Sequence, residues 1–74
     1  MDKLEAMLGI PEDKDDFVIE IYTDESSFGE IERKEGKLIL KIFNHSKRSS
    51  WNLDVEDFYK LLKKAKFELK ITDQ

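Results

Sequence analysis

Residues 28–43 read FGEIERKEGKLILKIF, and this stretch decides the predicted fold. Apolar and polar residues alternate on both sides of Glu35-Gly36, a pair that suits a two-residue turn because glycine accepts a positive φ. The stretch therefore predicts a β-hairpin. Outward from the turn, the predicted register pairs Lys34 with Lys37, Ile31 with Leu40, Glu30 with Lys41 and Phe28 with Phe43.

The two faces of this hairpin differ in character, because cross-strand partners share a face. The apolar face carries Ile31, Leu38, Leu40 and Ile42. The other face carries Phe28, Glu30, Glu32, Ile39, Lys41 and Phe43. Two interpretations of this mixed face stay open at this point. Either a short N-terminal helix covers its apolar residues, or the face is a binding surface or a subunit contact.

Shorter elements are predicted on both sides of the hairpin. The segment DKLEAMLG favours a short helix within residues 1–9, because Asp2 is a suitable cap and Leu4, Met7 and Leu8 share one helical face. Residues 17–22 alternate as a strand, and Trp51 alternates with Leu53 as a short final strand.

The C-terminal segment predicts an amphipathic helix over residues 54–70. Asp54 is a good N-cap, and acidic residues follow in the first turn, where they suit the helix dipole. An apolar stripe with helical spacing is formed by Val55, Phe58, Leu62, Ala65 and Leu69. Residues 67–71 also alternate as a strand would, but we favour continuation of the helix.

These elements predict one small α+β domain over residues 1–74. An antiparallel sheet of three to four strands within residues 17–53 packs against the C-terminal helix, and the short helix of residues 1–9 completes the fold. The apolar face of the hairpin and the Val55 stripe are expected to pack together.

Composition argues against several classes of function. The chain has no cysteine and one histidine, His45, so we expect no metal site, no cofactor and no catalytic residue. No apolar run approaches the length of a membrane span, and a cytoplasmic location is the expectation.

Charge is divided unevenly along the chain. Residues 1–32 carry eleven acidic and two basic residues, a net charge of −9, whereas residues 33–74 carry a net charge of +5. This asymmetry either indicates a directed binding surface or reflects the solvated exterior of a small fold.

Two segments resemble the C-terminal domain of the positive-cofactor-four transcriptional coactivators. They are GEIERKEGKLILKIF, similar to the charged hairpin of that family, and WNLDVEDFYKLLKKA, similar to its strand, cap and helix. The resemblance covers residues 28–66. It implies a curved antiparallel sheet followed by one helix, dimerisation, a role in transcription, and binding of single-stranded DNA across the sheet. It also implies phosphate contacts from Arg33, Lys34, Lys37, Lys41, Lys47 and Arg48, and base stacking on Phe28, Phe43 and Trp51.

Other interpretations remain beside this one. For Trp51 we favour a position in the core, since it precedes the helix and alternates with Leu53. The chain is alternatively an acidic protein-binding module, such as an inhibitor, an immunity protein or an anti-defence protein, with a basic protein partner. A homodimer would also cover an open sheet face. In the protein-binding interpretation the partner meets acidic residues that include Asp15, Asp16, Asp24 and Glu25.

Overall fold

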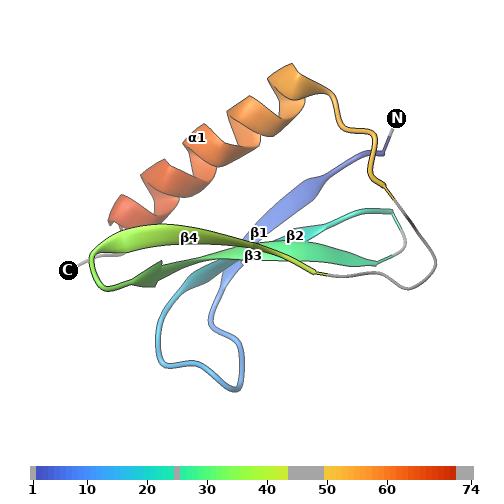
Figure 1. The fold of residues 1–74 in the computed structure, drawn as a ribbon. Helices are drawn as coiled ribbons and strands as arrows, with labels where there is room; N and C mark the ends of the chain where they lie inside the picture. Colours follow the sequence, from blue (N-terminus) through green and yellow to red (C-terminus); the bar gives the residue numbers. More distant parts are fainter. Residues whose placement is uncertain (1, 25, 44–49, 72–74) are drawn as a thin grey trace.

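In a computed structural model the protein is described at residues 2–24, 26–43 and 50–71. Within these ranges, four strands precede one helix, and the strands form one antiparallel sheet in the order β1-β2-β3-β4 (Figure 1). The predicted α+β sheet with a C-terminal helix is confirmed. The elements are β1 (Glu5–Gly9), β2 (Val18–Tyr22), β3 (Ser27–Lys34), β4 (Lys37–Ile42) and α1 (Val55–Ile71).

The hairpin of β3 and β4 has the predicted turn and register. Glu35 and Gly36 have φ values of 52° and 77°, the left-handed backbone that a tight hairpin turn requires at both central residues. The pairs Lys34–Lys37, Ile31–Leu40 and Glu30–Lys41 all form as predicted.

The predicted N-terminal helix is wrong, because residues 5–9 form strand β1. Two helical turns have too few backbone hydrogen bonds to be stable alone, whereas a strand can bond to a neighbouring strand. β1 pairs with β2, with Ala6 opposite Ile21 and Leu8 opposite Ile19. Ala6 and Leu8 are half-buried against the core. Alternation within β1 therefore supplies an apolar face to the sheet.

Phe28 lies in the core and not on the mixed hairpin face where simple alternation predicts it. Between β2 and β3 the register shifts, so that Ile21 lies opposite Gly29 and Tyr22 opposite Ser27. Phe28 is the extra residue of this bulge, and a bulge redirects a side chain. Its ring is 1% exposed and packs edge-on against Trp51, with 5.2 Å between the ring centroids.

Helix α1 begins at its predicted cap and continues through residues 67–71. The Asp57 amide donates a hydrogen bond to Asp54 Oδ2 at 3.0 Å, which satisfies a free amide of the first turn. Ala65 and Leu69 are buried, but Val55 is 79% exposed, so it does not belong to the buried stripe as predicted.

Residues 51–53 form no strand, so the sheet runs from residue 5 to residue 42 and not over residues 17–53 as predicted. Instead, Asn52 exchanges two hydrogen bonds with Asp2. The Asp2 amide donates to the Asn52 carbonyl, and the Asn52 amide donates to Asp2 Oδ2, each at 2.8 Å. The segment before α1 is thereby held against the start of the chain.

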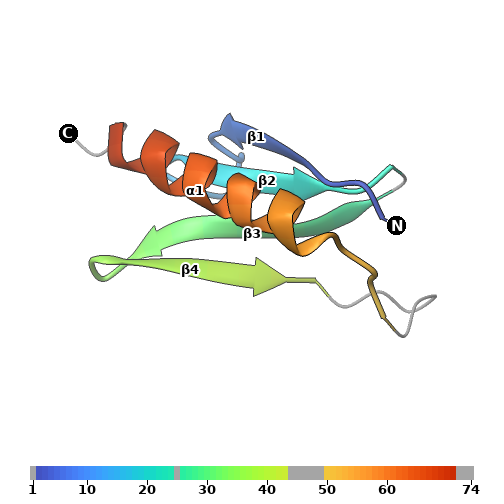
Figure 2. The same cartoon turned by 90° about the horizontal axis from the view of Figure 1, so that it is seen from above.

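The helix leaves strand β4 largely uncovered. Its contacts are principally with β1 and β2, and Figure 2 shows that β4 lies clear of it. The core between the layers contains Ile19, Ile21, Phe28, Ile31, Ala65 and Leu69. The apolar face of β4, which was expected to pack against the helix, is consequently left open along much of its length.

Candidate binding surface along strand β4

Strand β4 carries an open apolar row on the α1 side of the sheet. Leu38, Leu40 and Ile42 share the face of Ile31, because Leu40 lies opposite Ile31 and side chains alternate along a strand. Ile31 is 4% exposed, whereas the three β4 side chains are 40%, 36% and 53% exposed, respectively. The same face of the sheet is therefore buried at β3 and accessible at β4.

The backbone of the same three residues points to the outer edge of the sheet. The Phe43 amide donates to the Phe28 carbonyl at 2.8 Å, so position 43 bonds toward β3. In an antiparallel ladder, alternate residues bond to alternate sides. The backbone groups of positions 37, 39 and 41 thus bond to β3. The backbone N–H and C=O groups point away from β3 at Leu38, Leu40 and Ile42. Among the described residues, no strand pairs with that outer edge.

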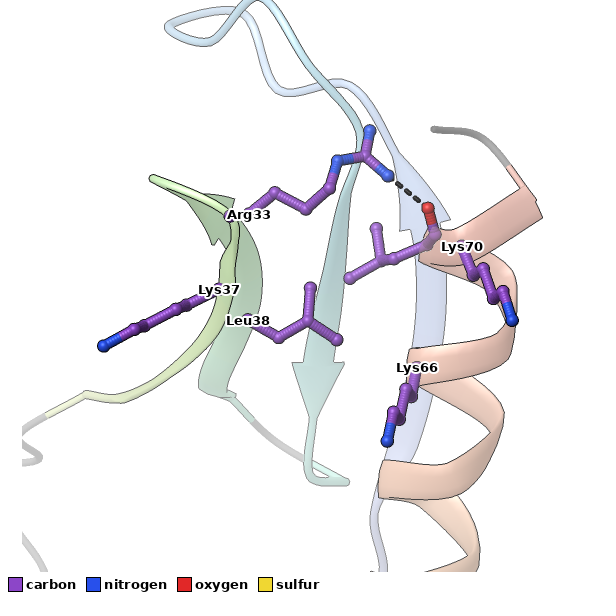
Figure 3. A pocket seen from close by; sticks show the side chains of 7 residues that line it. Arg33, Lys37, Leu38, Lys66 and Lys70 are labelled. Atoms are coloured by element: carbon purple, nitrogen blue, oxygen red, sulfur yellow. Dashed lines mark hydrogen bonds between the residues drawn. The ribbon is translucent and has the colours of Figure 1, made fainter. Parts of the chain in front are cut away.

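A shallow cavity separates the beginning of β4 from the end of α1. It has a volume of about 230 Å³ and contains Leu38 and Leu69 among its apolar lining residues. Lys66 and Lys70 of α1 also line it (Figure 3). Tyr59 lies two helical turns before Lys66 and is 56% exposed, which continues an accessible surface along the same side of α1.

Two lysines lie on the face of β4 that points away from α1. Lys37 extends away from α1 in Figure 3, and alternation places Lys41 on the same face with Ile39 between them. All three are exposed. We call β4 with its apolar row Leu38, Leu40 and Ile42 and its lysines Lys37 and Lys41 the β4 surface.

Arg33 is anchored and does not present a free guanidinium. Its Nε and Nη2 donate to the two carboxylate oxygens of Asp16 at 3.1 and 2.6 Å, and its Nη1 donates to the Leu69 carbonyl (Figure 3). The bidentate pair lowers the pKa of Asp16, chiefly through the hydrogen bond from Arg33. Arg33 thus ties the β1–β2 loop and the end of α1 to β3.

The predicted nucleic-acid contacts do not converge on one surface among the described residues. Lys34, Lys37 and Lys41 are exposed along the hairpin, and Phe43 is half-buried at its end. Trp51 is also half-buried, on the α1 side against Phe28. Lys47 and Arg48, as well as His45, lie outside the described residues.

The far face of the sheet is acidic near its centre and is crossed by the β1–β2 loop. Lys14 from this loop donates to Glu32 at 2.9 Å and lies 3.9 Å from Glu30. The hydrogen bond lowers the pKa of Glu32 and raises that of Lys14. Beside them, the Tyr22 hydroxyl donates to Glu20, which raises the pKa of Tyr22. The loop therefore occupies part of the face for which an N-terminal helix was one of the two predicted alternatives.

The acidic residues that were predicted to meet a basic partner lie in different environments. Asp15 and Asp24 are exposed, Asp16 is paired with Arg33, and Glu25 lies outside the described residues. Within the described ranges, no three histidine or carboxylate side chains are grouped to hold a metal ion. No helix in those ranges is long and apolar enough to cross a bilayer.

Comparison with known proteins gives no relative: no family model, no curated protein and no solved structure matches the chain significantly. The sequence analysis identified Lys37 and Lys41 of the β4 surface as candidate contacts, but it did not identify the apolar row as part of a site. Its signal was present in KLILKI, residues 37–42, where consecutive apolar residues place hydrophobic side chains on both faces of one strand.

Proposed function

We propose that this chain is a small, non-enzymatic binding module that takes up an extended polypeptide segment along β4. One observation carries the proposal. β4 is an edge strand, and the three alternate residues whose backbone groups point to the open edge, Leu38, Leu40 and Ile42, also have exposed apolar side chains. An added strand would satisfy their backbone groups and cover their side chains in the same step.

Edge strands of natural proteins are normally protected by charge, proline, bulges or a covering element. On the other edge strand, β1, the apolar face is covered, since α1 packs against β1 and Leu8 is half-buried. On β4 the lysines lie on the far face, and the α1 face carries only apolar residues. A partner strand is the natural cover for this edge.

A second candidate function is the binding of single-stranded nucleic acid, as the resemblance over residues 28–66 implies. The observation that favours it is the exposure of Lys34, Lys37 and Lys41 along one hairpin. Against it, Arg33 is engaged by Asp16 and Leu69, and Trp51 packs on Phe28. The polypeptide proposal therefore comes first.

The test is selection from a display library of short random peptides, with a labelled single-stranded oligonucleotide titrated in parallel. We expect selected peptides to slow hydrogen exchange at Leu38, Leu40 and Ile42, and to lose affinity for a Leu40→Lys variant. Met7→Lys, which changes an exposed residue on β1, is the matched control and should bind normally. Peptides that bind equally to both variants would overturn the proposal. Oligonucleotide binding that Lys37→Glu weakens, with no peptide selected, would establish the second candidate instead.

A further inference from the structure

The geometry of β4 also specifies which kind of segment would fit, and this inference rests on the proposed function. Successive side chains of an added strand point to opposite faces of the sheet. One set would lie beside Leu38, Leu40 and Ile42, where an apolar side chain is required. The other set would lie beside Lys37, Ile39 and Lys41, on the face away from α1.

The lysines on that second face favour carboxylates at a defined spacing. Lys37 and Lys41 are four residues apart and exposed. Charges of opposite sign attract each other when they face each other on neighbouring strands. Lys37 already faces Lys34 across the hairpin, a like-charge pair. A carboxylate on the open side of Lys37 would offset this repulsion.

The covered side of β4 shows this complementarity at one end. β3 places Glu30 opposite Lys41 and Ile31 opposite Leu40, whereas at the other end it places Lys34 opposite Lys37. An acidic, alternating strand would repeat the Lys41 pairing on the open side and would supply the carboxylate that β3 does not offer to Lys37.

We propose that β4 binds an extended segment of alternating apolar and polar residues, with acidic residues four positions apart opposite Lys37 and Lys41. A second copy of the chain fits less well. Antiparallel pairing of two β4 strands about Leu40 places Ile39 opposite Lys41 and Lys37 opposite Phe43, and supplies no carboxylate to either lysine. An acidic, alternating partner meets both requirements of the surface.

The probe is a labelled, capped peptide with the core Val-Glu-Val-Thr-Val-Glu-Val, whose symmetric spacing serves either strand direction. Its control replaces both glutamates with lysine and keeps the apolar residues. Titration of each peptide with the full chain, followed by fluorescence anisotropy at low salt, gives the two affinities. We expect the glutamate peptide to bind at least about tenfold more tightly. Added salt should reduce this preference.

Variants of the chain assign the effect to β4. Lys37→Glu should reduce or reverse the preference between the peptides, whereas Lys60→Glu makes the same charge change on an exposed helical residue and should preserve it. Leu40→Lys should abolish binding of both peptides, with circular dichroism to confirm that the variant folds.

The remaining outcomes each overturn a defined part of the reasoning. Equal affinity for both peptides, lost in Leu40→Lys, overturns the acidic partner but leaves strand addition in place. If neither peptide binds while library-selected peptides do bind at β4, the acidic partner is likewise overturned and strand addition stays in place. Sedimentation that shows a dimer dissociated by Leu40→Lys assigns the edge to a second copy and overturns the inference.

Discussion

The position of Phe28 leads to a quantitative prediction about stability. Its side chain is 1% exposed, and its ring packs edge-on against Trp51 and Phe58 with centroid separations of 5.2 and 6.5 Å. Removal of a buried Phe side chain costs about 3–5 kcal/mol. A chain of 74 residues has a total stability on the order of 4–11 kcal/mol. Phe28→Ala should therefore remove a large part of this stability, and it leaves little folded protein if the total lies at the lower end of the range.

A milder substitution makes the test measurable. Phe28→Leu keeps most of the apolar volume but loses both edge-on ring pairs, each of which contributes about 0.5–1.5 kcal/mol. We expect a loss of roughly 1–3 kcal/mol in urea unfolding followed by circular dichroism and Trp51 fluorescence. Phe67→Leu, at a 63% exposed position on α1, is the control and should change stability by less than about 0.5 kcal/mol. Equal, small effects of the two substitutions would refute the bulge and return Phe28 to the open face.

Three further predictions concern the turn, the close approach of strands and acid stability. Glu35→Asn should stabilise the chain by about 0.5–1 kcal/mol, because asparagine tolerates the left-handed backbone better, and thermal unfolding would show this gain. Gly29→Ala should destabilise it by about 1–3 kcal/mol in urea unfolding, because a Cβ there would clash with the Lys41 carbonyl oxygen. The lowered pKa values of Asp16 and Glu32 stabilise the folded state above about pH 4 and lose this effect as the pH falls and both carboxylates become protonated. The unfolding temperature should thus fall below that pH, and less steeply in Asp16→Asn. An unchanged slope in that variant would contradict the role of the ion pair.

The hairpin was predictable because its determinants are local. Glu35-Gly36 specifies the turn, and the turn fixes every pair of the β3–β4 register, including Ile31 with Leu40. The start of α1 was predictable for the same reason, since Asp54 caps the amide of Asp57 within one turn. Local chemistry of this kind is fully present in the sequence.

The N-terminal strand and the bulge depend on partners distant in the sequence. Residues 5–9 are compatible with helix or strand, and only the presence of β2 as a partner decides between them. Phe28 reaches the core because β2 and β3 shift register at Ile21 and Tyr22, and strand alternation alone cannot reveal such a shift. In both cases tertiary pairing overrides the local pattern.

The candidate site was only partly predictable for a related reason. Lys34, Lys37 and Lys41 were identified from the sequence and are exposed, but Arg33 carries the same charge and is held by Asp16 and Leu69. The sequence does not show which basic residues are paired within the fold. It also does not show that α1 lies toward β1 and β2, which is what leaves β4 open.

The most direct test of the account is amide hydrogen exchange along β4, measured by NMR with and without the glutamate peptide. In the free chain, we predict rapid exchange at Leu38, Leu40 and Ile42 and slow exchange at Ile39 and Lys41, because alternate amides bond to β3. The peptide should then slow exchange at the three outward amides. Protection of those three amides in the free chain, or no change on addition of the peptide, would contradict the claim that β4 is an open edge that receives a strand.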